Sequence, residues 1–336
     1  KSGPIVMELL TGLVLLFSLL NGANDSGTMA ASVVSSRTLS PRQSVALAAA
    51  ASFLGAVLLG SEVARTLGVG LIRLDRVIAA GSFAACPAAV GAAILWSLLV
   101  WRLALPGSYT HALLGGWLGA FTAVSGFGVV HWDQAGWILL AVFLTPLAGL
   151  VAAWIAIRLL LRYGSELSMH AMPLFRAIQT LLFAGLCFAH GANVAQKGMA
   201  LLVAGQYLAA GLDIPAAFPI PVWVRLSCSA AFSLGVLAGF SRVLKTVGFG
   251  IFKVDVLHSL CAISSAGGLV LASTAAGMPL SPGQINSSAL LGAGAGENAR
   301  TVRWSVAGDL LLSWVMTFPA CAVLAFLLVH IIKMAG

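Results

Sequence analysis

The chain has 336 residues, of which 60% are hydrophobic and only 8% are charged, and its mean hydropathy is +1.02. A soluble domain carries about 25% charged residues, so this composition excludes a soluble globular protein. The net charge of +8 comes from basic residues that lie between apolar runs, as in loops at membrane surfaces, and not from the clustered face of a nucleic-acid-binding protein. The sequence therefore predicts an all-α polytopic membrane protein whose partner is a lipid bilayer, with no nucleic-acid partner.

The first apolar run, residues 5–20, is short for a bilayer crossing and leads directly into a polar stretch at residues 21–28. Glycine and amide residues at this place indicate a broken helix. The backbone N–H groups that the break frees can bind an anion, and the freed carbonyl oxygens can bind Na⁺. Asp25 lies inside this stretch, and an acid between apolar half-helices is functional by default. Its partner is either a cation or Lys197. A glycine kink with capping amides is the alternative.

An internal repeat follows. Residues 54–75 align without a gap with residues 234–255, and Gly55, Gly68 and Asp75 recur as Gly235, Gly248 and Asp255. Together with the motifs described here, this similarity predicts two transmembrane repeats. The predicted repeats cover residues 5–163 and 174–336, and the short polar join lies around residues 162–176. The equivalent loops at residues 65–76 and 242–253 are both basic, so charge does not tell how the halves are oriented.

A second kind of polar motif occurs once in each half, at residues 106–111 and 279–284. Each motif separates apolar segments that are too short to cross a membrane singly, and small residues follow it. This pattern indicates a re-entrant hairpin with hydroxyl groups at its tip, in which the small residues allow close helix packing. An ordinary turn outside the membrane is the alternative.

The motif at residues 21–28 has a counterpart at residues 190–198, where Gly191, Ala192 and Asn193 repeat Gly22, Ala23 and Asn24. Interrupted hydrophobic helices in corresponding places of two halves are a sequence signature of a transporter binding site. No nucleophile–base pair or metal cluster accompanies them, which disfavours an enzyme. A passive channel stays open as an alternative. We expect His190 to be a packed, hydrogen-bonded histidine.

The paired signatures at residues 21–25 and 188–199, with the tip at residues 106–111, resemble those of the inorganic phosphate transporter (PiT) family, over nearly the whole chain and in the family's order. The resemblance implies two inverted-topology repeats with broken helices and re-entrant hairpins. It also implies secondary active symport of inorganic phosphate with Na⁺ or H⁺, with no other cofactor, by a homodimer.

The resemblance also implies roles for individual residues. The expected phosphate-binding residues are Asp25, Ser108, Thr110, Gln196 and Ser281. The expected cation-binding residues are Asn21, Asn24, Asp25 and Asn193, with Na⁺ at Asn24, Asp25 and Asn193.

Two departures from the family pattern affect these expectations. Val194 replaces the aspartate of the second signature, and residues 282–284 replace hydroxyls and a histidine. Fewer acceptors for a protonated anion would favour sulfate, so a sulfate or related oxyanion permease is the alternative function. Asp25 is retained and can accept a hydrogen bond from protonated phosphate, which favours phosphate. The expected location is the plasma (inner) membrane, as a multi-pass protein.

Overall fold

The computed structural model describes residues 3–79, 85–102, 107–164, 171–215, 217–239, 247–248 and 250–335. Apart from one isolated bridge between Ile72 and Val130, every regular element in these residues is helical, which confirms the all-α prediction. The elements of the first half are α1 (Gly3–Ser35), α2 (Pro41–Leu58), α3 (Glu62–Arg65), η1 (Thr66–Gly70), α4 (Leu74–Ala79), α5 (Ala85–Arg102), α6 (Tyr109–Ser125), η2 (Phe127–Val129) and α7 (Trp132–Tyr163). Those of the second half are α8 (Met172–Ala210), α9 (Val222–Ala238), α11 (Val256–Ala275), α12 (Pro282–Asn298) and α13 (Trp304–Ala335).

Six of the described helices, α1, α2, α7, α8, α11 and α13, are long and apolar enough to cross a membrane. Two shorter apolar helices, α5 and α9, accompany them. Large apolar side chains such as Trp137, Leu147 and Leu311 are exposed on the outer helices, as expected for a surface that faces lipid. The chain is therefore a multi-pass membrane protein.

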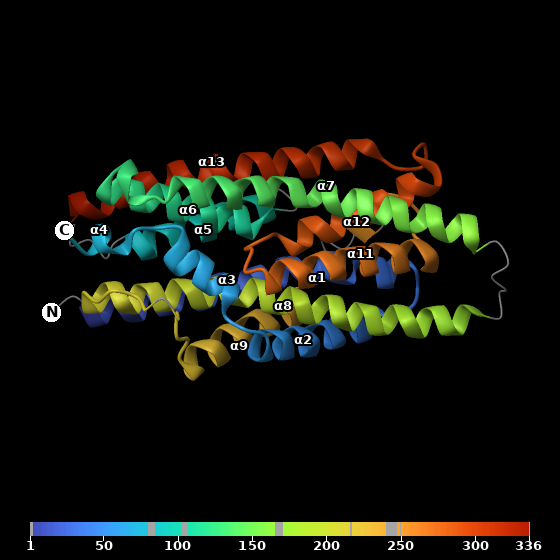
Figure 1. Ribbon diagram of the computed structural model, residues 1–336, viewed down its shortest axis with the longest axis horizontal. Helices are drawn as coiled ribbons and strands as arrows, with labels where there is room; N and C mark the ends of the chain where they lie inside the picture. The colour runs from blue at the N-terminus through green and yellow to red at the C-terminus, as the bar shows by residue number, and fades with distance from the viewer. Residues whose placement is uncertain are drawn as a thin grey trace.

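The two halves run in opposite directions along the molecule (Figure 1). Helix α1 starts at the end that holds both chain termini, whereas its counterpart α8 starts at the opposite end, where α7 finishes. Helices α7 and α13 are antiparallel in the same way. The repeats are thus inverted, as the family resemblance implies. Residues 165–170 of the predicted join lie outside the described residues, and the predicted repeat boundaries stay a prediction.

The signature helices α1 and α8 are continuous and are not broken at residues 21–28 or 190–198. The glycines there allow helices to approach closely. A Cβ atom on Gly22 would lie 2.0 Å from the Phe232 carbonyl oxygen of α9, and one on Gly191 would lie 2.2 Å from the Ser52 carbonyl oxygen of α2. Each signature helix therefore packs backbone to backbone against the second helix of the other repeat. The glycines of the signatures thus allow close helix packing. The breaks that the sequence predicted there are absent, because both helices continue through these residues.

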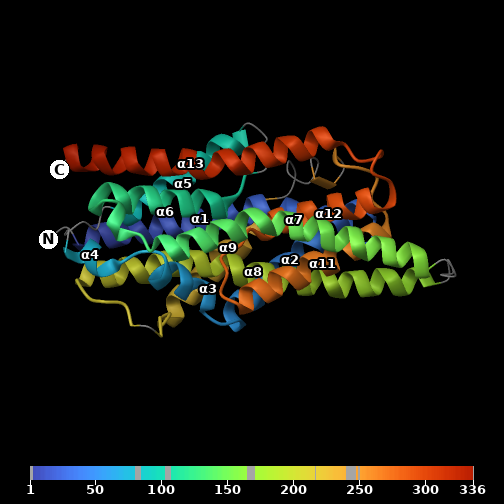
Figure 2. The same cartoon turned by 45° about the horizontal axis from the view of Figure 1, so that its top comes forward.

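The predicted hairpins are present as the helix pairs α5–α6 and α11–α12. They lie toward opposite ends of the molecule in Figures 1 and 2, and their tips meet in its interior, where the Oγ atoms of Ser108 and Ser281 are 3.2 Å apart. Helices α5 and α6 of the first hairpin have 18 and 17 residues and are about 25 Å long, and neither is among the six helices that are long and apolar enough to cross a membrane. Pro106, part of the first predicted tip, lies outside the described residues.

Small residues behind the tips allow close packing, as the sequence predicted. A Cβ atom on Gly119 of α6 would lie 2.1 Å from the Ala322 carbonyl oxygen of α13. In the other repeat, a Cβ atom on Gly292 of α12 would lie 2.0 Å from the Leu150 carbonyl oxygen of α7. The second helix of each hairpin is thus packed backbone to backbone against a long helix of the other repeat.

The open ends of the second hairpin are joined by an ionic cluster. The Asp255 carboxylate caps α11 by accepting a hydrogen bond of 2.9 Å from the His258 N–H. The two ring nitrogens of His258 lie 2.8 Å from Asp255 and 2.9 Å from Glu297 near the end of α12. Partial burial acts to raise the pKa of the Asp255 carboxyl, but hydrogen bonds from His258 outweigh it and hold the pKa below its usual value.

Replacing Asp255 by alanine is expected to lower the stability of the purified protein by about 1 kcal/mol, because α11 loses its N-cap. The lowered pKa makes this contribution present above the unfolded-state pKa and lost as the pH falls through the folded-state pKa. Thermal unfolding of the two proteins at neutral and acidic pH measures the difference. Asp133→Ala, at an exposed aspartate in the first turn of α7, is the control. Equal melting temperatures for wild type and Asp255→Ala at neutral pH would contradict the capping role.

Candidate functional site

The predicted site residues lie on four helices. Asn21, Asn24 and Asp25 come from α1, Asn193 and Gln196 come from α8, and the hydroxyl residues come from the N-termini of α6 and α12. All of them are buried: Asn21, Asn24, Asp25, Ser108, Thr110, Asn193, Gln196 and Ser281. Buried polar groups without partners are costly, so the contacts of these side chains indicate what the site can do.

The N-termini of α6 and α12 meet at the serines in their N-cap positions, Ser108 and Ser281. Ser108 accepts a hydrogen bond from the His111 N–H at 3.3 Å, and its Oγ lies 2.6 Å from Nδ1 of the same histidine. Gln284, at the equivalent place in α12, brings its Nε2 within 3.3 Å of that Nδ1 atom. Each helix N-terminus carries a partial positive charge and free N–H groups. Two of them at one buried point form an anion-binding arrangement.

Lys197 of α8 places its ammonium group beside the tips. Its side chain is completely buried, and Nζ donates hydrogen bonds to Oγ1 of Thr110 at 2.7 Å and to the Leu280 carbonyl oxygen at 2.6 Å. Thr110 itself donates to the same carbonyl at 3.0 Å. One lysine thus connects both hairpin tips, with a third ammonium hydrogen still available.

Asp25 is the buried acid on the α1 side of the site. Its Oδ2 lies 2.9 Å from Nε2 of His190 on α8, and its Oδ1 accepts a hydrogen bond of 3.3 Å from Asn24. A Cβ atom on Gly283 would lie 3.4 Å from Oδ1 of Asp25, so the carboxylate also faces the start of α12. The sequence predicted a packed, hydrogen-bonded histidine at position 190, which the structure confirms, but it did not identify Asp25 as the partner. The signal for its role was its place directly before Gly191, in the motif that repeats the one with Asp25.

Asn193 and Gln196 bind backbone groups near the site. Asn193 donates to Oγ1 of Thr274 and to the Met278 carbonyl oxygen, and its own Oδ1 is buried with no partner among the described residues. Gln196 accepts hydrogen bonds from two backbone N–H groups, those of Val63 and Ala64, with its side-chain oxygen. Asn193 therefore offers a free oxygen next to the α11–α12 tip, whereas the oxygen of Gln196 holds the start of α3.

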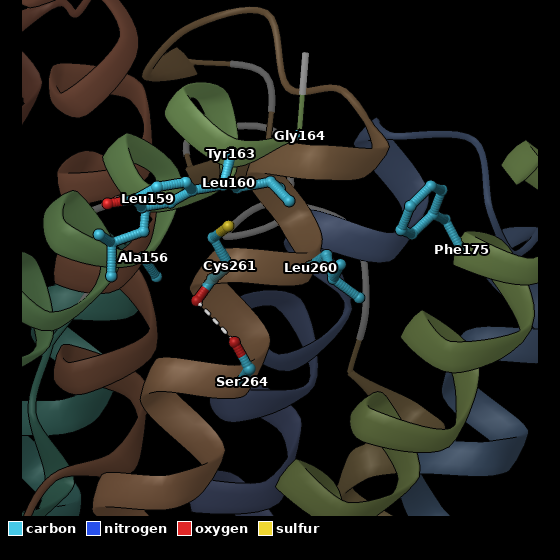
Figure 3. Close-up of a pocket in the computed structure, with 9 residues that line it drawn as sticks. All are labelled: Ala156, Leu159, Leu160, Tyr163, Gly164, Phe175, Leu260, Cys261 and Ser264. Atoms are coloured by element: carbon cyan, nitrogen blue, oxygen red, sulfur yellow. Dashed lines mark hydrogen bonds between the residues drawn. The ribbon is translucent and has the colours of Figure 1, made fainter. Parts of the chain in front are cut away.

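A separate pocket of about 450 Å³ lies at one end of the molecule, between the end of α7, the start of α8 and α11 (Figure 3). Its lining is mostly hydrocarbon, such as Leu160 and Phe175, and its polar groups include Cys261 and Ser264. None of the predicted site residues lines it. The polar centre at the hairpin tips is therefore the better candidate for a binding site.

Comparison with known proteins gives the family. The family model described as "Phosphate transporter family" matches residues 21–173 and again residues 164–325. The chain belongs to the phosphate transporter family. The two matches correspond to the two inverted repeats, and together they cover nearly the whole chain.

Relatives of this family member agree with the assignment. A protein of Rhizobium meliloti (strain 1021) named "Probable low-affinity inorganic phosphate transporter" is 32% identical over 96% of each chain. A protein of Bacillus subtilis (strain 168) with the same name is 31% identical over 95% of each. The solved structure titled "The sodium-dependent phosphate transporter" has a TM-score of 0.89, with 20% identity, over 99% of this chain and 100% of that one. This match shows that the chain shares that fold. The family model and the relatives show that the chain is a transporter and not an enzyme.

Proposed function

We propose that this protein is a secondary active transporter that carries inorganic phosphate across the membrane together with Na⁺ or H⁺. The observation that carries the proposal is the meeting of the α6 and α12 N-termini at Ser108 and Ser281, whose Oγ atoms are 3.2 Å apart in the buried interior. Serine hydroxyls and helix N-termini donate hydrogen bonds to an oxyanion. The names of the relatives support phosphate as that anion.

The contacts of Asp25 favour phosphate over sulfate. Phosphate near neutral pH carries a proton that it can donate, whereas sulfate has none. Asp25 faces the start of α12, because its Oδ1 would lie 3.4 Å from a Cβ atom on Gly283. In this position, the carboxylate can accept a hydrogen bond from the P–OH group of a protonated anion, whereas a fully ionised anion offers it no hydrogen.

The same region supplies oxygen atoms for a coupling cation. Hard cations such as Na⁺ prefer carboxylate, amide and carbonyl oxygens, and Asn24, Asp25 and Asn193 supply the first two kinds. The buried Oδ1 of Asn193 has no partner among the described residues, which fits a cation ligand. Asn21 lies one helical turn before Asn24 on α1 and belongs to the same proposed cation site. A plasma-membrane location and a homodimeric assembly are part of this proposal.

Uptake by the purified protein in sealed proteoliposomes tests the anion and the cation separately. Radiolabelled phosphate is supplied with a sodium gradient alone, a proton gradient alone, or neither, and unlabelled phosphate or sulfate is added in excess. We expect one gradient to drive uptake, and we expect unlabelled phosphate to compete far better than sulfate. Equal competition by sulfate would overturn the choice of anion. If neither the sodium gradient nor the proton gradient drives phosphate uptake, symport is overturned.

The serine pair at the tips offers a direct test of the anion site. Replacing Ser108 and Ser281 together by alanine is expected to weaken phosphate affinity by about tenfold per lost hydroxyl, because each one removes about 1–1.5 kcal/mol of hydrogen bonding. The measurement is the phosphate concentration at half-maximal uptake. Ser264→Ala, which loses only a local hydrogen bond in α11, is the control. Unchanged affinity in the double variant would place the anion elsewhere.

A further inference from the structure

We propose that the ammonium group of Lys197 is a built-in cation that takes the place of a mobile coupling ion in the second repeat. The inference rests on the proposed function. It goes beyond that function because it explains how many coupling cations accompany each phosphate ion. A transporter of this design takes up one fewer free cation per anion than a symmetric site with a carboxylate in each repeat.

The internal repeat identifies the equivalent positions. Because residues 22–24 recur as residues 191–193, continuing the register makes Asp25 equivalent to Val194, and Thr28 equivalent to Lys197. The hairpin tips align in the same way at Ser108 and Ser281. Thr110 of α6 is therefore equivalent to Gly283 of α12.

The contacts follow this equivalence. In the first repeat, Asp25 and Thr28 face the start of α12, because a Cβ atom on Gly283 would lie 3.4 Å from Oδ1 of Asp25 and 3.3 Å from Oγ1 of Thr28. In the second repeat, Lys197 faces the start of α6 and donates to Thr110 at 2.7 Å. The same face of each signature helix therefore meets the N-terminus of a hairpin helix, with a carboxylate on one side and an ammonium on the other.

The ligands of the ammonium are those that a sodium ion takes. Nζ of Lys197 binds a hydroxyl oxygen, that of Thr110, and a main-chain carbonyl oxygen, that of Leu280. Both are neutral oxygen donors, and both belong to hairpin tips. A charge buried at 0% exposure needs such partners. The ammonium thus occupies an oxygen-lined cation position and connects the two tips, as a bound ion would.

The charges at the two equivalent positions explain why an ion is needed on one side only. Asp25 presents a negative charge that attracts a mobile cation. Val194 presents none, and the ammonium group of Lys197 repels a second cation. The third hydrogen of the ammonium remains available for the anion. The second repeat therefore contributes its positive charge through the protein itself.

The test measures phosphate uptake by proteoliposomes as a function of the concentration of the coupling cation, whichever of Na⁺ and H⁺ drives uptake, for three proteins and one control. The wild type is compared with Lys197→Met, which removes the charge and keeps most of the length, and with the double variant Val194→Asp, Lys197→Thr, which copies the first repeat. Lys333→Met, at an exposed lysine near the end of α13, is the matched control. Size-exclusion profiles and melting temperatures of each protein report folding.

We expect Lys197→Met to weaken phosphate uptake by about 30-fold or more, since the anion loses a buried positively charged partner. The double variant is expected to recover uptake at high concentrations of the coupling cation, with a steeper dependence on that cation than the wild type. Uptake by Lys197→Met equal to wild type, or a double variant no steeper than wild type, would overturn the proposal. A lysine with a purely structural role would not change the steepness.

The wild type also gives a measurement that needs no variant. Its uptake should be first-order in the coupling cation, whether that cation is Na⁺ or H⁺, and a higher order would overturn the proposal even if neither variant folds. Failure of the proposed function has a different signature. In that case wild-type vesicles take up no phosphate under either gradient, whereas failure of the lysine proposal leaves wild-type phosphate uptake intact.

Discussion

Replacing Asp25 by asparagine is expected to reduce gradient-driven phosphate uptake to the level of vesicles without protein. Asp25 is 8% exposed, and it is the carboxylate of the two signatures. Asparagine preserves the size of the side chain and can still bind His190, but it removes the negative charge that attracts a cation and the strong acceptor for a protonated anion. The measurement is initial uptake of radiolabelled phosphate under the driving gradient.

The matched control for this variant is Asp309→Asn, because Asp309 also lies in a membrane-spanning helix, α13, but its side chain is exposed. We expect Asp309→Asn to transport as the wild type does. If Asp25→Asn keeps wild-type uptake, Asp25 has no part in the mechanism and the proposed cation site is wrong.

A single methyl group on Gly191 is expected to destabilise the protein severely. Its Cβ atom would lie 2.2 Å from the Ser52 carbonyl oxygen and 2.4 Å from the Ser52 Cα atom of α2. Real Cβ atoms do not come so close, so α2 and α8 must separate. Overpacking of this kind costs about 1–3 kcal/mol or more, and here it acts on backbone that cannot rotate away. The expected result for Gly191→Ala is a large drop in melting temperature or loss of monodisperse protein.

Gly185 provides the matched control within the same helix. It also lies in α8, but a Cβ atom there would meet no atom within 4 Å among the described residues. Alanine favours a helix over glycine by about 0.5–1 kcal/mol, so Gly185→Ala is expected to leave the melting temperature unchanged or raise it. Gly22→Ala and Gly12→Ala form the same pair in α1. If Gly191→Ala melts as Gly185→Ala does, α2 and α8 are not in backbone contact.

Local sequence patterns predicted much of this fold. Apolar runs indicated the helices, and the recurrence of Gly22 and Asn24 as Gly191 and Asn193 indicated the repeats. Glycines inside a membrane helix have two meanings, however. They can mark a break, or they can let another backbone approach, and only the position of the neighbouring helix decides between these meanings. The sequence alone therefore predicted breaks in α1 and α8, where the structure has continuous helices.

The contacts between distant residues were not predictable for a related reason. The pairing of His190 with Asp25 joins α8 to α1, and the pairing of Lys197 with Thr110 joins α8 to α6. Both depend on how the repeats cross, which composition and spacing do not encode. The hydroxyls of Ser108 and Ser281 were predictable as tip residues. Their meeting across the interior was not, because it depends on two hairpins that enter from opposite ends.

The most direct test of the central claim is the steady-state accumulation of phosphate in sealed vesicles that contain the purified wild-type protein. The interior and exterior phosphate concentrations are measured under an imposed sodium or proton gradient, before and after an ionophore collapses that gradient. The proposed symport predicts an interior concentration above the exterior one, and release of the excess when the ionophore is added. Equal concentrations inside and outside throughout would show passive permeation, and would contradict the proposed symport.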